Sequence, residues 1–140
     1  MLKSSSNKKI KNATITEYNG IKFRSQLELR AYKVLTQAGL AVSYEPEPVK
    51  LLEGWKSEIK RFIKGKWETS KIRDWTYTPD FIVSNKDKTI FIEMKGFGND
   101  QLPLKRKMFL HYLEENYSPE EVEYWEIYKI TELKQLINEL

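Results

Sequence analysis

Hydrophobic residues first recur at a helical spacing between Ser25 and Gly39. Apolar side chains stand three or four positions apart there, as one face of a helix requires, at Leu27, Ala31, Val34, Leu35 and Ala38. Ser25 and Glu28 fit a capping box, and Gly39 supplies a stop signal. The pattern predicts a helix over residues 25–38.

Two further helices are predicted in the last third of the chain. Pro103 is typical of a first helical turn, and we expect its helix to end near Tyr117, before Ser118 and Pro119, with an apolar side formed by Leu104, Met108, Tyr112 and Leu113. We expect Thr131 to cap a final helix that turns inward Leu133, Leu136, Ile137 and Leu140.

Shorter apolar or β-branched runs predict strands between these helices, at residues 41–44, 49–52, 75–77, 81–83, 89–95 and 122–130. Residues 84–88 read Ser-Asn-Lys-Asp-Lys, a composition typical of turns. The strands on either side of this turn should therefore form an antiparallel hairpin. The main elements follow the order α-β-β-β-α-β-α, which predicts an α/β fold.

The length of 140 residues suits one domain. Residues 1–12 are polar and rich in Ser, Asn and Lys, so we expect a flexible basic segment there. Residues 13–140 would form the domain, with a basic insertion at about 54–74. The insertion interleaves Trp and Phe with Lys and Arg, and Lys64-Gly65 suits the turn of a hairpin.

Three interpretations of the insertion remain open. It could contact phosphates and pack against an opened or branched strand, it could be an amphipathic hairpin that covers the sheet, or it could be an arm that joins two copies of the chain. On the first interpretation its candidate DNA contacts are Lys60, Arg61, Lys64 and Lys66.

Charge is distributed unevenly behind a formal net charge of +4. Residues 56–73 carry seven Lys and Arg against two Glu, whereas the last 29 residues carry two bases and eight acids. The asymmetry suggests a polyanion partner, although a solvated mixed-charge surface is the alternative. The second helix opens with three cations, Lys105, Arg106 and Lys107. The helix dipole disfavours cations at this end, so their presence favours a phosphate bound nearby.

The composition excludes several kinds of chemistry. With no Cys and only His111, the chain lacks thiolate catalysis, disulfides and the usual zinc sites, so any metal would be held by oxygen. No apolar run approaches the length of a spanning helix, and the start lacks the apolar centre of a signal peptide. We therefore expect a soluble, cytoplasmic protein with no membrane partner.

Asp80, Glu93 and Lys95 form the candidate chemical site. Side chains alternate along a strand, so Glu93 and Lys95 lie on the same face, and a hairpin would bring Asp80 toward Glu93. Two carboxylates that close repel each other unless a divalent cation such as Mg²⁺ lies between them. Lys95 could then orient a water or stabilise charge on a phosphate. Glu-x-Lys is, however, also a common surface ion pair, and Pro-Asp a common turn.

These motifs resemble those of a known superfamily. Asp80, Glu93-Met94-Lys95 and the element order are similar to the PD-(D/E)XK nucleases, which have a restriction-endonuclease-like core. A closer resemblance is to the phage endonuclease I family of Holliday-junction-resolving enzymes, and it rests on Phe23-Arg24-Ser25-x-Leu27-Glu28, Tyr77-Thr78-Pro79-Asp80-Phe81 and Glu93-x-Lys95-Gly96. Together these motifs span about half of the chain.

The resemblance implies a central mixed sheet flanked by helices, and metal ligation by Asp80, Glu93 and the Met94 carbonyl. It makes Lys95 the catalytic lysine and gives Glu28, which helix capping alone would explain, a role at a second metal. It also implies Mg²⁺, with Mn²⁺ as a substitute, a four-way or other branched DNA substrate and a homodimer. Arg24, within the first motif, becomes a candidate DNA contact.

Two alternatives remain to the cleavage of branched DNA. One is another PD-(D/E)XK endonuclease, of a restriction or genome-processing type. The other is a module on the same fold that binds DNA without cutting it. The longer insertion and the different C-terminal part set the chain apart from the family that it resembles, and they bear on substrate preference more than on chemistry.

Overall fold

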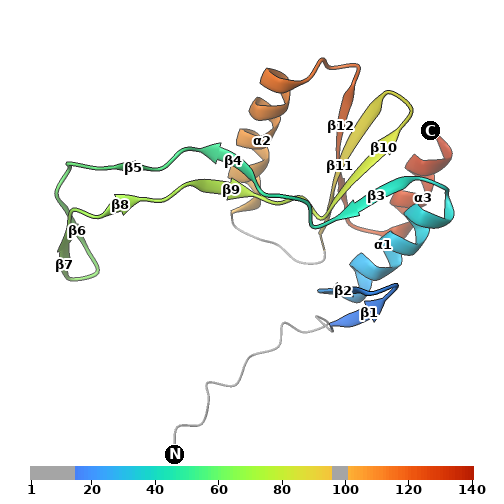
Figure 1. Cartoon of the computed structure of the whole chain (residues 1–140), viewed down its shortest axis with the longest axis horizontal. Helices are drawn as coiled ribbons and strands as arrows, with labels where there is room; N and C mark the ends of the chain where they lie inside the picture. The colour runs from blue at the N-terminus through green and yellow to red at the C-terminus, as the bar shows by residue number, and fades with distance from the viewer. Residues whose placement is uncertain (1–14, 96–100) are drawn as a thin grey trace, which may run out of the picture.

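A computed structural model describes residues 15–95 and 101–140, and these form a four-stranded sheet with helices on both faces and a long projecting arm (Figure 1). The helices are α1 (Gln26–Gln37), α2 (Leu102–Asn116) and α3 (Ile130–Asn138). The sheet contains β3 (Ala41–Tyr44), β10 (Phe81–Asn85), β11 (Lys88–Met94) and β12 (Val122–Ile127). The strand order across it is β12-β11-β10-β3.

The sheet is mixed. β10 pairs antiparallel with both β3 and β11, and a turn at residues 86–87 joins β10 to β11 as the sequence predicts. β12 lies parallel to β11, because the chain crosses over through α2 before it re-enters the sheet. The predicted α/β class is confirmed as a mixed α/β arrangement.

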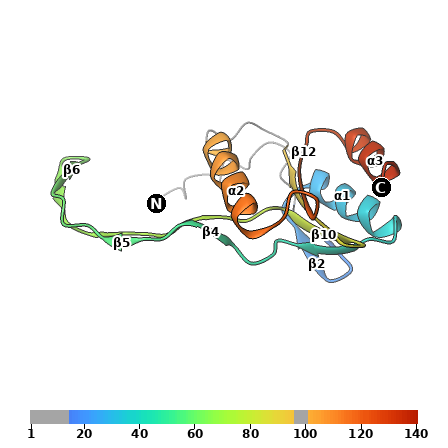
Figure 2. The same ribbon diagram turned by 90° about the horizontal axis from the view of Figure 1, so that it is seen from above.

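Each face of the sheet has its own apolar core. Figures 1 and 2 show α2 on one face and α1 with α3 on the other. Alternation along β11 directs Ile90, Ile92 and Met94 into the core with α1 and α3, and directs Phe91 into the core with α2. Glu93 has the same parity as Phe91 and therefore lies on the α2 face.

The predicted insertion forms a two-stranded arm, defined here as residues 49–77. Three successive antiparallel pairs build it, namely β4 (Val49–Leu52) with β9 (Trp75–Tyr77), β5 (Trp55–Lys56) with β8 (Lys71–Ile72), and β6 (Arg61–Ile63) with β7 (Lys66–Glu68). It extends away from the sheet beyond α2 (Figures 1 and 2). The interpretation in which this hairpin covers the sheet is therefore wrong.

Turn chemistry explains the tip of the arm. Lys64 and Gly65 have φ values of 54° and 79°, which are the two left-handed residues of a type I′ turn. The predicted hairpin turn is thus confirmed. The same chemistry occurs at Asn19-Gly20, with φ values of 51° and 75°, between β1 (Thr16–Tyr18) and β2 (Ile21–Phe23). We did not predict this hairpin, although Asn-Gly is a strong signal for one.

The helices differ in detail from the prediction. The Oγ of Ser25 accepts the N–H of Glu28 at 3.1 Å, so the N-cap of α1 is confirmed, but Ala38 is exposed. In α2 the buried residues are Leu102, Phe109 and Leu113, whereas Leu104 is 56% exposed. Of the predicted apolar side of α2, Leu113 is therefore confirmed and Leu104 is wrong, because the helix turns Phe109, about 100° around from Met108, into the core.

The third helix begins two residues earlier than expected. Thr131 lies inside α3, and the cap position is Lys129, whose N–H donates to the Glu132 carboxylate at 2.8 Å. The cap at Thr131 was therefore wrong, and Leu140 at the end of the chain is exposed rather than inward. The preceding strand ends at Ile127, because the backbone turns there into the helix.

Two parts of the sequence prediction concern residues that the structure does not describe. The basic segment at residues 1–12 and Gly96 lie outside the described residues. Within residues 15–95 and 101–140, no helix combines the length and the apolar character that crossing a membrane requires.

Candidate functional site

Three acidic residues from separate elements converge where β11 ends. Glu28 is in the first turn of α1, Asp80 immediately precedes β10, and Glu93 is the second-last residue of β11. Because Phe81 pairs with Ile92, the hairpin register brings Asp80 opposite the end of β11. We call Glu28, Asp80 and Glu93 the acidic cluster.

Asp80 is fixed by the backbone of the strand that carries Glu93. Its Oδ2 accepts the N–H of Met94 at 2.7 Å. Burial, followed by the negative charges of Glu93 and Glu28, raises the pKa of Asp80 to about 9, and a hydrogen bond with Glu28 acts in the same direction. The environment of Asp80 thus favours the protonated form of its carboxyl.

Glu28 is buried, with only 7% of its surface exposed. The Tyr44 hydroxyl, on β3, donates to its Oε2 at 3.1 Å. The backbone N–H of Arg24 in turn donates to the Tyr44 hydroxyl at 3.2 Å. The side chain of Glu28 thus faces Asp80 and Tyr44, in addition to the structural role that its backbone has in the helix cap.

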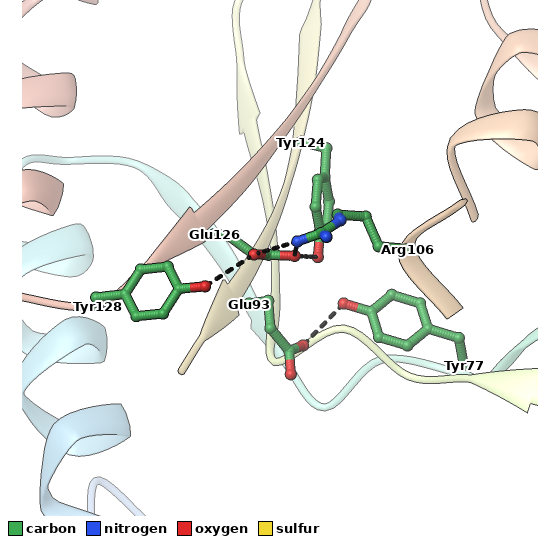
Figure 3. A network of polar contacts seen from close by, with 6 residues as sticks. All are labelled: Tyr77, Glu93, Arg106, Tyr124, Glu126 and Tyr128. Atoms are coloured by element: carbon green, nitrogen blue, oxygen red, sulfur yellow. Dashed lines mark hydrogen bonds and ion pairs between the residues drawn. The ribbon is translucent and has the colours of Figure 1, made fainter. Parts of the chain in front are cut away.

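Glu93 is held on the side facing α2. The Tyr77 hydroxyl, at the base of the arm, donates to Glu93 Oε2 at 2.8 Å, and the other carboxylate oxygen points away from Tyr77 (Figure 3). Burial raises the pKa of Glu93; the Tyr77 hydrogen bond lowers it, Glu126 and Glu28 raise it, and Lys105 lowers it. The net direction is upward, because burial exceeds the favourable contacts.

Glu126 is a fourth acid near the site that sequence reasoning missed. It pairs with Glu93 across the parallel strands β11 and β12. Arg106 Nη1 donates to both of its oxygens, at 2.9 and 2.8 Å, and Tyr124 and Tyr128 donate at 3.0 and 3.3 Å (Figure 3). Burial raises the pKa of Glu126, but the hydrogen bonds from Arg106 and the tyrosines outweigh it and the net pKa is lowered.

Lys95 follows directly after β11. Its N–H donates to the Ile127 carbonyl at 2.8 Å, which continues the pairing with β12 by one residue. Its Nζ lies 5.7 Å from the centre of the Tyr128 ring, within range of a cation–π contact. Tyr128 thus contacts both Lys95 and Glu126.

The predicted DNA-contacting cations fall into three groups. Arg24 forms an ion pair of 2.6 Å with Glu45, and Arg106 is bound to Glu126. Lys105 lies 5.0 Å from the centre of the Trp75 ring and is close enough to Glu93 for its charge to act on that carboxyl, while Lys107, two residues further along α2, is exposed. The third group is at the far end of the arm, away from the acidic cluster (Figure 1), and consists of Lys60, Arg61, Lys64 and Lys66.

The donor atoms of the cluster are those that a hard divalent cation prefers. All three side chains offer carboxylate oxygen, and burying like charges together is unfavourable unless protons or a cation compensate for them. In the described ranges, however, no three acidic or histidine side chains are already close enough together to hold a metal ion. The residues suit Mg²⁺ by chemistry; the Tyr77 hydroxyl holds one carboxylate oxygen of Glu93, and the other oxygen points away from Tyr77 (Figure 3).

These features define a mixed α/β protein with a partly buried acidic cluster at one end of its sheet. Residues 7–126 match the family described as "Protein of unknown function (DUF1064)", and the chain belongs to that family. The match includes the acidic cluster and the whole arm. No curated protein matches the chain.

Proposed function

We propose that this protein is a metal-dependent endodeoxyribonuclease that cleaves branched DNA, most specifically four-way junctions. The observation that carries the proposal is the convergence of Glu28, Asp80 and Glu93 from three elements at one end of the sheet, with Lys95 two residues beyond Glu93. Acidic side chains gathered in a partly buried site are costly, and a divalent cation is the usual compensation.

The arrangement of elements supports a restriction-endonuclease-like core. After the N-terminal hairpin, the sheet and its helices follow the order α1, β3, β10, β11, α2 and β12, with β11 and β12 parallel. This is the α-β-β-β-α-β order implied by the resemblance to PD-(D/E)XK nucleases. The arm is an insertion between β3 and β10 and leaves that order intact.

In the proposed site Asp80, Glu93 and the Met94 carbonyl would hold Mg²⁺, with Mn²⁺ as a substitute, and Glu28 would serve a second ion. The ion would polarise the scissile phosphate and lower the pKa of an attacking water. The chain's residues prepare this arrangement, because the Met94 N–H orients Asp80 and the Tyr77 hydroxyl orients Glu93. Lys95 would orient the attacking water or stabilise charge on the phosphate.

The substrate part of the proposal rests on charge and on the motif resemblance. Lys105 of α2 is close enough to Glu93 for its charge to act on that carboxyl, and Lys107 is exposed on the same helix, so both are suitable contacts for DNA phosphates. Symmetric cleavage of a four-way junction needs two active sites, so a homodimer follows from the proposed substrate.

The decisive experiment is cleavage of a labelled four-way junction by the parent protein and by Glu93→Ala, with Mg²⁺ and with a chelator. We expect cleavage only for the parent with Mg²⁺. Asp87→Ala is the matched control, since Asp87 is an exposed acid in the turn at the opposite end of the same hairpin, and it should cleave normally. Equal rates for Glu93→Ala and the parent would refute the site.

Glu28→Gln tests the role assigned to the first helix. The amide keeps the Ser25 cap, which uses only the backbone N–H of residue 28, so folding should be nearly intact. We expect cleavage to be abolished. A panel of flap, nicked and linear duplex DNA would separate junction cleavage from other nuclease targets, and binding to all of them without cleavage would indicate a non-cleaving module.

A further inference from the structure

The arm exposes large hydrophobic side chains that a protein normally buries. Trp67 is 71% exposed and Phe62 is 61% exposed, and the exposed set on the arm comprises Leu52, Trp55, Ile59, Phe62, Ile63 and Trp67. Neither apolar core includes any of these six. An apolar patch of this kind marks an interaction surface, because water contact with it is unfavourable.

Two of these residues form a pair at the tip. Phe62 and Trp67 are directly opposite in the β6–β7 register, so their side chains share one face of the hairpin. Their ring centres are 5.3 Å apart at an interplanar angle of 56°. The type I′ turn at Lys64-Gly65 holds the two strands together. The tip is therefore a defined aromatic platform rather than a disordered apolar segment.

The surroundings of the platform are cationic. Residues 56–73 carry seven Lys and Arg against two Glu. A surface hollow of about 410 Å³ lies beside Trp67 and is lined by Lys60, Trp67, Glu68 and Thr69. An occupant of this surface must combine flat apolar faces with negative charge.

We propose that the tip of the arm, formed by Phe62, Trp67 and Lys60, is a stacking site for unpaired bases of DNA. A nucleotide has both required properties, since its base offers a flat π face and its phosphate a negative charge. Paired bases in a duplex are already stacked on their neighbours, so the platform favours single-stranded or opened DNA. The inference rests on DNA as the partner in the proposed function but not on hydrolysis.

The returning half of the arm, which contains β7, β8 and β9, connects this platform to the acidic cluster. β9 ends at Tyr77, which donates to Glu93, and only Thr78 and Pro79 separate it from Asp80. Trp75 on the same strand lies under Lys105 of α2. DNA bound at the tip would thus be held by the same hairpin whose base orients Glu93, which suits a branched substrate with opened strands.

The test compares full-length variants for binding to a labelled single strand of mixed sequence and to the same strand in duplex, with a chelator present to prevent cleavage. Trp67→Ala should weaken single-strand binding about tenfold or more and change duplex binding much less. Trp67→Phe, which keeps a ring, should restore most of the affinity. Ile59→Ala is the matched control, because Ile59 is equally exposed, at 71%, on the same arm but has no ring; it should stay within about twofold of the parent, since stacking needs a π face.

Three results would overturn the inference. The first is unchanged single-strand binding by Trp67→Ala, and the second is an equal loss in Ile59→Ala. The third is a change of mass from dimer to monomer in Trp67→Ala, measured by light scattering without DNA, because the occupant of the platform would then be a second copy of the chain. Since the binding assays need no metal, a parent that fails to cleave would refute the nuclease proposal and leave base stacking supported.

Discussion

The acidic cluster and the tip of the arm violate ordinary folding preferences in opposite ways. At the cluster, like charges are buried together, and the pKa values of Asp80 and Glu93 are raised as a consequence. At the tip, aromatic rings that would stabilise a core are left in water. Each arrangement costs stability in the protein alone, and in the functions proposed above a partner would offset that cost, a cation in one region and a nucleotide in the other.

The difference between the two regions lies in their structural support. The cluster is attached to the central sheet and is braced by Tyr44, Tyr77 and the Met94 N–H. The tip is supported by its own hairpin, and none of the helices α1, α2 and α3 in the described part of the chain packs on it (Figure 2). The proposed ion site needs the rigid sheet to fix its ligands, whereas the proposed stacking site needs to extend away from the sheet to contact a strand of DNA.

The largest expected effect is on cleavage by Asp80→Asn. The amide oxygen can still accept the Met94 N–H, but the negative charge needed for a cation is lost. We expect cleavage of the four-way junction to fall about 10²–10³-fold, while the melting temperature stays the same or rises because repulsion in the cluster is relieved. Asp87→Asn should change neither quantity. A large fall in melting temperature for Asp80→Asn would mean that the cluster is structural.

The next effect concerns pH and metal. The folded-state pKa of Asp80, about 9, is above its ordinary value, so the folded protein retains a proton that the unfolded chain loses. With a chelator, the free energy of unfolding should therefore fall as pH rises from about 4 to about 9. At pH 8, Mg²⁺ at about 100 times its Kd should restore about 2.7 kcal/mol. Thermal melting in chelator and in Mg²⁺ measures the pH dependence of stability and the stabilisation by Mg²⁺. Asp80→Asn should reduce both of these changes.

A smaller effect is expected at the junction between the two regions. Tyr77→Phe removes the hydroxyl that donates to Glu93 and keeps the ring that packs on Phe109, 4.8 Å away between centres. The free energy of unfolding should fall by about 1 kcal/mol, and cleavage should fall only severalfold. Tyr112→Phe, whose ring also packs on Phe109, is the control. Denaturant unfolding and cleavage rates check this, and a complete loss of cleavage would give Tyr77 a direct role in the reaction.

The smallest effect on stability should follow from shortening the arm. Residues 57–70 can be replaced by Asn-Gly, so that Lys56 and Lys71, which already pair, are joined by a two-residue turn. Because neither apolar core contains these residues, the free energy of unfolding should change by less than about 0.5 kcal/mol. A cooperative loss of folding on thermal melting would show instead that the arm stabilises the sheet.

Prediction from sequence succeeded where the determining contacts are local. The capped start of α1 at Ser25, the turn at Lys64-Gly65 and the hairpin that carries Asp80 and Glu93 each depend on residues a few positions apart. The predicted apolar side of α2 used Met108, whereas the structure buries Phe109, and the predicted cap of α3 at Thr131 lies two residues beyond the observed cap at Lys129. An error of one residue turns a helix by about 100°, which is enough to misplace its buried face.

The sequence by itself determined the elements, their order and the acids that an antiparallel hairpin must bring together, since short-range sterics and hydrogen bonding decide these. Only the tertiary structure decided that β12 lies parallel to β11 and brings Glu126 beside Glu93, and that this acid binds Arg106. It alone decided that the arm points away from the sheet. These features depend on contacts between residues distant in the chain, and local patterns do not encode which of several distant pairings buries the most apolar surface.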